Sequence, residues 1–271
     1  MYIVATPIGN LADKSSRMLS VLSSVDIIVA ENPRHTHKLL LDHEVDCEWV
    51  KVADATEKKV TNDIFFRIQE GANVALVSDA GTPLVSDPGY RLVRMCREGG
   101  VEISPVPGPC AAIAALSVSG MPVHQFKFIG FLSSQSGTRQ RQIHQLQWSQ
   151  VTTILYESPH RIAKLVLELS DILGQDREVF FIREMTKQYE ESFFGTASAL
   201  CDFIHQKKSR LRGEMVVIIS PAQELIDLGP LERMAMPCYR VLGLSKASEM
   251  LSHGLGLKKR FVYDFIKKKI Q

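Results

Sequence analysis

The chain has 271 residues, of which 45% are hydrophobic and 23% charged, so it is long enough for two modest domains and is not disordered in composition. No apolar run approaches the length of a membrane span, and the first residues lack the basic leader of a signal peptide, so we expect a cytoplasmic protein. The five cysteines are scattered and odd in number, which argues against a disulfide framework or a zinc site and favours a reducing compartment.

The first 120 residues alternate short apolar strands with helical patterns. This alternation predicts an α/β fold with a mainly parallel sheet. The last helix of this part is rich in alanine and can lie close against a sheet. We predict strands at 2–5, 27–30, 74–77 and 101–106, and helices at 16–25, 58–70, 91–98 and 110–119.

Gly120 and Pro122 mark the expected boundary to a second α/β domain. Closely spaced extended segments between residues 180 and 194 give this half more opportunity for antiparallel pairing. The predicted domains are therefore 1–120, 121–224 and a basic helical tail at 225–271. Within the second domain we predict strands at 126–131, 152–156, 178–182 and 215–220, and helices at 161–173 and 197–206.

The tail carries most of the positive charge. Residues 240–271 include eight Lys or Arg and two acidic residues, whereas the rest of the chain is slightly acidic, which suggests a polyanionic partner. We predict a short helix at 245–252, capped by Ser245 and ended by Gly254, and a basic helix at 258–270. Two interpretations stay open, namely a small helix-turn-helix appendage and a C-terminal helix docked on the body.

Residues 74–89 are the most informative segment. An apolar strand is followed by small, turn-forming residues and two carboxylates, Asp79 and Asp87. Ligands of open α/β sheets bind beyond the carboxyl ends of the strands. Gly81 allows the backbone to approach a ligand closely, and Pro83 stiffens the loop. The alternative interpretation is an ordinary strand-to-helix connection in which an aspartate caps the helix.

Further polar loops follow other predicted strands. The loop at residues 5–11 has one glycine, so the dinucleotide-binding and P-loop patterns are both absent, and no metal-binding motif occurs. Glu31, Arg34 and His35 could orient a substrate or carry protons, or they could belong to a helix start with Pro33 in its first turn. Segments 156–161, 183–191 and 212–214 offer a polar floor from the second domain, which predicts a site in an interdomain cleft.

Six motifs follow one another in order along the chain. They are Ala-Thr-Pro-Ile-Gly-Asn-Leu (5–11), Ser-Asp-Ala-Gly-Thr-Pro-Leu-Val-Ser-Asp-Pro-Gly-Tyr (78–90), Pro-Gly-Pro (107–109), Tyr-Glu-Ser-Pro-His-Arg (156–161), Arg-Glu-Met-Thr-Lys (183–187) and Arg-Gly-Glu (212–214). Taken together, they resemble one family from the first residue to the tail. It is the bacterial ribosomal RNA small subunit methyltransferase I family, a branch of the tetrapyrrole methylase-like, class III S-adenosylmethionine enzymes.

The resemblance implies two α/β domains with S-adenosylmethionine between them, a homodimer, and methylation of a cytidine 2′-hydroxyl in small-subunit (16S) ribosomal RNA. By position, it implies candidates for proton relay or charge stabilisation at Glu31, Arg34, His35 and Lys187. It also implies cofactor contacts at Pro7, Ile8, Asp79, Gly81, Thr82, Pro83, Cys110, Ala111, Tyr156, Thr186 and Gly213.

The chain departs from the family pattern on its expected substrate face. Asn32 and Pro33 stand where the family usually has Asp-Thr, and segment 52–57 lacks the family's two histidines, with only Asp54 and Glu57 charged. The basic loop is reduced to Arg139 and Arg141, which we expect to contact phosphate. Two alternatives remain. One is a tetrapyrrole methyltransferase, against which the basic tail argues. The other is a non-catalytic RNA- or ribosome-binding relative, which the lost histidines favour and which the intact Glu31, Arg34, His35 and Asp79 loop oppose.

Overall fold

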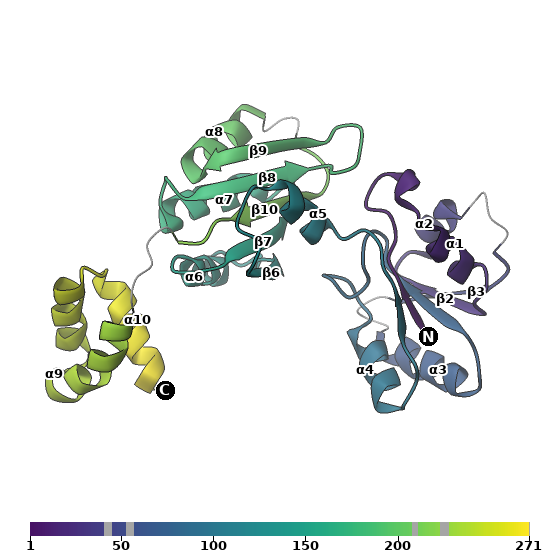
Figure 1. Ribbon diagram of the computed structural model, residues 1–271, viewed down its shortest axis with the longest axis horizontal. Coiled ribbons are helices and arrows are strands. Elements are labelled where there is room, and N and C mark those ends of the chain that lie inside the picture. Colours follow the sequence, from purple (N-terminus) through teal and green to yellow (C-terminus); the bar gives the residue numbers. More distant parts are fainter. Residues whose placement is uncertain (41–44, 53–56, 208–210, 223–227, 271) are drawn as a thin grey trace. The chain divides into compact units, whose positions relative to one another are not determined.

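The computed structural model describes residues 1–40, 45–52, 57–207, 211–222 and 228–270. The chain forms two compact units, Met1–Ala222 and Gln223–Gln271 (Figure 1). The predicted boundary at residues 224–225 and the charged position Asp54 both lie outside the described residues. Among the helices of the described ranges, none combines the length and apolarity that a bilayer crossing needs. All five cysteines are free thiols.

The first sheet of the larger unit is parallel, as the sequence predicted, with the strand order β3-β2-β4-β1-β5. The carboxyl ends of its central strands meet at one edge, where the loops of the candidate site begin. Its strands are β1 (Tyr2–Val4), β2 (Ile27–Ala30), β3 (Glu48–Lys51), β4 (Val74–Val77) and β5 (Ser104–Val106). Its helical segments are η1 (Leu11–Asp13), α1 (Ser16–Leu22), α2 (Pro33–Leu39), α3 (Glu57–Gln69) and α4 (Tyr90–Glu98).

Helices cover both faces of this sheet. Met18 and Leu22 of α1 pack with Ile28 on one face, together with Leu39 of α2. On the other face, residues of α3 and α4 pack against β2 and β4. Every residue of β2 and of β4 is therefore buried, which explains why these strands are continuous apolar runs in the sequence.

The second sheet is mixed, with the order β6-β7-β10-β8-β9. Strands β6 and β7 are parallel, and the other neighbours are antiparallel, as expected for this half. Helices α6, α7 and α8 contribute to one hydrophobic cluster with it. The elements are β6 (Phe126–Phe131), α6 (Ser136–Leu146), β7 (Thr152–Glu157), α7 (Ile162–Leu173), β8 (Glu178–Arg183), β9 (Glu191–Thr196), α8 (Ala197–Lys207) and β10 (Met215–Ile219).

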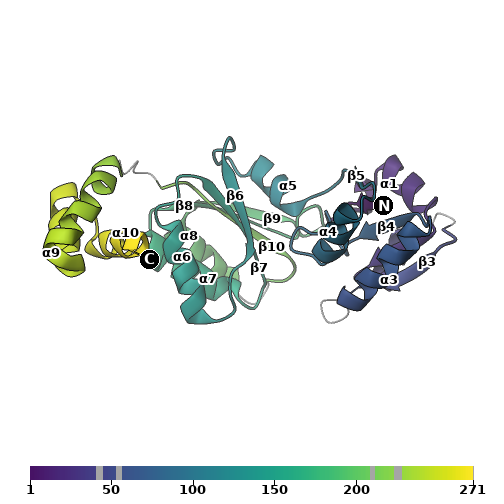
Figure 2. The same ribbon diagram turned by 90° about the horizontal axis from the view of Figure 1, so that it is seen from below.

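Helix α5 (Ala111–Val118) packs against the second sheet, although it follows the last strand of the first. Its buried Ala112 and Ala115 belong to one cluster with Ile154 of β7 and Val216 of β10. Figures 1 and 2 both place α5 beside this sheet. The chain therefore passes from one sheet to the other between β5 and α5.

The smaller unit consists of α9 (Gly229–Leu255) and α10 (Lys259–Ile270) around its own buried apolar cluster. Gly243, with φ 74° and ψ 168°, interrupts α9. The helix predicted at 245–252 lies in the part of α9 that follows Gly243. Ser245 is not its capping residue, because the helix resumes directly after Gly243. The prediction that Gly254 ends it was also wrong, since Gly256 follows the last helical residue with a left-handed φ of 66°.

Candidate cofactor-binding site

Three loops at the edge of the first sheet are joined by hydrogen bonds. The backbones of Thr6 and Gly81 exchange two bonds of 2.9 and 3.0 Å. Thr6 Oγ1 also donates to the Ser78 carbonyl at 3.1 Å, and Thr82 Oγ1 donates to the Pro109 carbonyl at 3.0 Å. Gly81 has a φ of +87°, which a glycine adopts without steric cost. These bonds hold the loops after β1, β4 and β5 as one wall.

The opposite wall comes from the loops after β8 and before β10. Glu184 and Thr186 have left-handed φ values of 50° and 67°, conformations that cluster at functional sites in non-glycine residues. Thr186 Oγ1 accepts a hydrogen bond from the Asn10 backbone N–H at 3.1 Å. Gly213 has a φ of +82°, and a side chain there would overlap the carboxyl group of Glu184. The Thr186–Asn10 bond thus joins the two walls, and the packing of Gly213 against Glu184 holds together the two loops of this wall.

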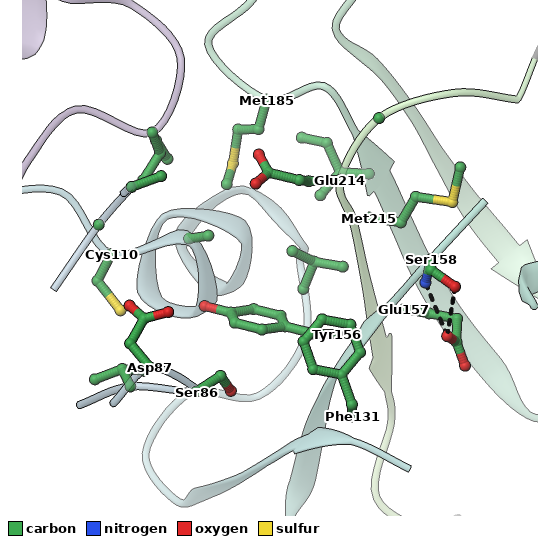
Figure 3. A pocket seen from close by; sticks show the side chains of 18 of the residues that line it. Ser86, Asp87, Cys110, Phe131, Tyr156, Glu157, Ser158, Met185, Glu214 and Met215 are labelled. Atoms are coloured by element: carbon green, nitrogen blue, oxygen red, sulfur yellow. Dashed lines mark hydrogen bonds between the residues drawn. The ribbon is translucent and has the colours of Figure 1, made fainter. Parts of the chain in front are cut away.

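A cavity of about 300 Å³ lies between these walls. This volume is at the small end of the usual range for cofactor sites. Most of its surface is apolar, and hydroxyl and carboxyl groups supply the polar contacts (Figure 3). It is lined by Ile8, Ala80, Gly81, Thr82, Val85, Ser86, Asp87, Cys110, Ala111, Phe131, Tyr156, Glu157, Ser158, Pro159, Ile182, Met185, Gly213, Glu214, Met215 and Val216.

Tyr156 is the central aromatic group of the cavity. Its hydroxyl oxygen accepts a hydrogen bond from the Ala112 N–H at 3.0 Å, and its ring meets those of Phe128 and Phe131 edge-on. Burial raises the pKa of the Tyr156 hydroxyl, and the nearby Cys110 and Asp87 act in the same direction. The phenol is therefore neutral at physiological pH.

The charged groups that line the cavity are all carboxylates, namely Asp87, Glu157 and Glu214. Burial raises the pKa of Asp87 to about 6, and the negative charges of Glu31, Asp79 and Glu214 add to this rise, whereas a hydrogen bond with Ser78 opposes it. A cavity with this charge favours a positively charged guest.

Seven of the eleven cofactor residues implied by the resemblance line the cavity. They are Ile8, Gly81, Thr82, Cys110, Ala111, Tyr156 and Gly213. The other four lie in the surrounding loops, and their contact with a cofactor stays a prediction. Pro7 and Pro83 are buried, Thr186 binds the backbone of Asn10, and Asp79 Oδ1 accepts from the Asn32 N–H at 3.0 Å.

The four candidates for proton relay or charge stabilisation lie outside the cavity lining. Arg34 and His35 are exposed on α2, and Glu31 lies close enough to influence Asp87. Lys187 Nζ contacts Glu184 Oε1 at 3.0 Å and Glu214 Oε2 at 3.1 Å. Burial alone would lower the pKa of Lys187, but these two carboxylates outweigh it and raise the pKa. Lys187 is therefore already paired with two carboxylates.

Thirteen of the twenty lining residues were missing from the predicted site, and three of them, Asp87, Glu214 and Phe131, show what the sequence did and did not signal. Asp87 was identified as the second carboxylate after β4, but an aspartate at this place could equally have been a helix cap, so it was not assigned to the site. Glu214 closes the Arg-Gly-Glu motif. Phe131 ends β6, where alternating apolar residues predict a strand and nothing marks one of them as a cavity residue.

The expected phosphate contact at Arg139 was wrong. Arg139 is 4% exposed and forms a two-point ion pair with Glu168, at 2.6 and 2.9 Å. Its remaining nitrogen donates to the carbonyls of Ser133 and Ser134. Arg139 therefore holds the loop after β6, whereas Arg141 is exposed.

The comparisons with known proteins agree with this geometry. The family model for tetrapyrrole (corrin/porphyrin) methylases matches residues 1–201. Among solved structures, the uroporphyrin-III C-methyltransferase of Thermus thermophilus complexed with S-adenosyl homocysteine is similar, with a TM-score of 0.56 and 16% identity over 82% of this chain and 97% of that one. The fold and the site thus define a methyltransferase of the tetrapyrrole methylase class that uses S-adenosylmethionine.

Curated relatives identify the branch of this class. The ribosomal RNA small subunit methyltransferase I of Escherichia coli O157:H7 is 39% identical over 98% of this chain and 93% of its own length. The protein of the same name from Vibrio cholerae is 40% identical over 97% of this chain and 92% of its own length. The chain belongs to the ribosomal RNA small subunit methyltransferase I family.

The residues of the cavity fit S-adenosylmethionine. Apolar contact area for the adenine ring is offered by Ile8, Ala111 and Val216. The hydroxyl groups of Thr82 and Ser86 can form hydrogen bonds with the polar groups of the cofactor. The lining carboxylates suit a molecule whose sulfonium and ammonium groups outweigh its one carboxylate. Within the ranges that the structure describes, no group of three or more His, Cys, Asp or Glu side chains is arranged to hold a metal.

Proposed function

We propose that this protein transfers a methyl group from S-adenosylmethionine to the 2′-hydroxyl of a cytidine in small-subunit ribosomal RNA. One observation carries this proposal above the others. Over nearly its whole length the chain is 39–40% identical to relatives named ribosomal RNA small subunit methyltransferase I. The cavity supports the proposal further, since it gathers the motifs at 78–90, 156–161 and 212–214 around one space.

The cofactor, when bound, supplies a methyl group on a sulfonium, which is already a good leaving group. The protein has to align the attacking hydroxyl and accept or relay its proton. Glu31 and His35 are our candidates for that relay, because they follow β2 at the same sheet edge as the cavity loops. Arg34 and Lys187 are the candidates for stabilising phosphate or a developing oxyanion.

The smaller unit is our candidate for sequence-independent RNA binding. Val262 and Ile266 of α10 are buried, whereas most of its basic side chains are exposed. Two of its lysines already have acidic partners, since Lys259 contacts Glu249 and Lys269 lies 4.0 Å from Glu232. If the other basic side chains of this unit contact phosphate groups, RNA binding should weaken steeply as the salt concentration rises. The exposed basic side chains are Arg233, Arg240, Lys246, Lys258, Lys259, Arg260, Lys267, Lys268 and Lys269.

Phe131 supports a nucleotide substrate. Its side chain lines the cavity and is still 54% exposed. Single-stranded bases are commonly recognised by stacking on such rings. We assign to Phe131 the stacking of an unpaired base next to the target ribose.

We propose further that the protein is a cytoplasmic homodimer. Exposed apolar side chains along α5 and the edge strand β6, including Ile113, Val118, Phe126 and Ile129, offer a surface that a second copy would cover. Light scattering of the purified protein tests the assembly. A monomeric mass at micromolar concentration would contradict it.

The activity is tested by transfer of a labelled methyl group. Small ribosomal subunits from a strain that lacks this gene are the substrate, with subunits from the parent strain as the matched control. We expect label in the RNA of the deletion strain and little in the control, where the position is already modified. Cofactor binding without transfer would contradict the RNA substrate, and transfer to a tetrapyrrole instead would establish the alternative activity.

A further inference from the structure

Asp87 differs from the other carboxylates of the cavity because it has no cationic partner in the part of the chain that the structure describes. Glu157 contacts Arg161 at 3.2 Å, and Glu214 contacts Lys187 at 3.1 Å. Among the residues that the structure describes, no Lys, Arg or His nitrogen lies within 4.0 Å of the Asp87 carboxylate. Asp87 thus brings an uncompensated negative charge to the cavity wall.

The surroundings of Asp87 increase this effect. Figure 3 shows its carboxyl group directed toward the Tyr156 hydroxyl and the Cys110 thiol, neither of which carries a positive charge. The charged groups close enough to act on it are Glu31, Asp79 and Glu214, which are all acidic. Burial of an unpaired carboxylate among like charges is unfavourable, and a cation that enters the cavity relieves it.

We propose that Asp87 is the residue that selects the positively charged methyl donor over the neutral thioether that remains after methyl transfer. The proposal rests on the cofactor site described above. S-adenosylmethionine and S-adenosylhomocysteine differ by one methyl group and by the positive charge of the sulfur. An uncompensated carboxylate on the cavity wall stabilises the first and does little for the second, so it favours cofactor loading and product release.

The same relationship predicts a pH dependence for donor binding. The pKa of Asp87 in the free protein is about 6, so the carboxylate is charged above this pH and neutral below it. A bound cation lowers that pKa, and donor affinity therefore falls as the pH decreases through the range around 6. The thioether has the same ammonium and carboxylate groups as the donor. The titration of these groups therefore cancels in the ratio of donor affinity to thioether affinity.

Calorimetric titration of the full chain with donor and with thioether tests this, at about pH 7.5 and at about pH 5. We expect Asp87→Asn to weaken donor binding by about tenfold at the higher pH and to change thioether binding by less than about twofold. Asp87→Glu should keep most of the selectivity. Ser86→Ala is the matched neutral control, and it should affect both ligands equally.

Several outcomes would overturn the proposal. Equal losses for donor and thioether in Asp87→Asn would show a structural role, and an affinity ratio in the unaltered protein that is independent of pH would show that no charge selection occurs. If circular dichroism shows that Asp87→Asn does not fold, the ratio of donor to thioether affinity in the unaltered protein and in Asp87→Glu still tests the proposal. Absence of any donor binding to the unaltered protein would instead contradict the cofactor site itself.

Discussion

The phenolic oxygen of Tyr156 on β7 accepts a hydrogen bond from the backbone N–H of Ala112, at 3.0 Å. Ala112 lies in the first turn of α5, where backbone N–H groups have no acceptor within the helix. The residue before the helix, Cys110, makes no side-chain capping bond. Tyr156, a side chain of the second sheet, thus supplies the hydrogen-bond acceptor that the first turn of α5 lacks. The same turn places Ala111 at the cavity.

Tyr156→Phe removes this acceptor. We expect a stability loss of about 1 kcal/mol, because one partly buried N–H loses its partner. We also expect weaker S-adenosylmethionine binding, since Cys110 and Ala111 lose their anchor. Urea unfolding and calorimetry check the two effects. Unchanged cofactor affinity would contradict the anchoring role.

Gly213→Ala tests the close approach of the two loops, after β8 and before β10, that form one wall of the cavity. The left-handed φ of +82° and the overlap with Glu184 both oppose a side chain. We expect a stability loss of about 1–3 kcal/mol and a strong decrease in cofactor affinity.

Gly137→Ala is the matched control, because Gly137 lies in α6 with open space where a methyl group would go. Alanine there should stabilise the protein by about 0.5–1 kcal/mol and leave cofactor binding unchanged. If both substitutions had the same effect on cofactor affinity, the geometry assigned to Gly213 would be wrong.

We expect the buried Arg139–Glu168 pair to contribute to stability and not to RNA binding. Arg139→Ala leaves Glu168 buried without its partner, so we expect a loss of about 3–5 kcal/mol. Arg139 holds the pKa of Glu168 below its usual range, so this contribution is present above about pH 4.3 and is lost as the pH falls further. Arg141→Ala should leave stability unchanged. Thermal unfolding of both variants as a function of pH measures the contrast.

Asp79→Ala distinguishes two roles of the first carboxylate. Asp79 Oδ1 accepts from the backbone of Asn32, the residue before α2. Loss of this bond predicts a decrease in stability of about 1 kcal/mol, which Asp79→Asn should largely avoid because it keeps an acceptor. If both variants instead lost cofactor affinity at unchanged stability, Asp79 would hold the polar end of the cofactor, as the resemblance implies.

Much of the fold could be predicted from the sequence because buried strands are recognisable. The runs at 27–30 and 74–77 match β2 and β4, since both strands are buried on each face. Strand β3 was missed because it lies at a sheet edge and begins and ends with exposed charged residues, Glu48 and Lys51. Helix α9 was predicted only in part, since its first half contains Pro237 and ends at Gly243.

The site could be predicted only as far as its loops. The positions of Gly81, Thr82 and Tyr156 follow from strand ends and motifs. The sequence gives no signal for which charges are already neutralised. Arg139 and Lys187 therefore looked like free cations, although each contacts carboxylates that lie far away in the sequence or across a turn.

The most direct test of the proposed function is mass spectrometry of nucleosides from small-subunit RNA after incubation with this protein and S-adenosylmethionine. We expect one new product, cytidine methylated on the ribose, which survives as a methylated sugar after the base is removed. A methyl group on a base, or no methylated nucleoside although the cofactor binds, would contradict the proposed reaction.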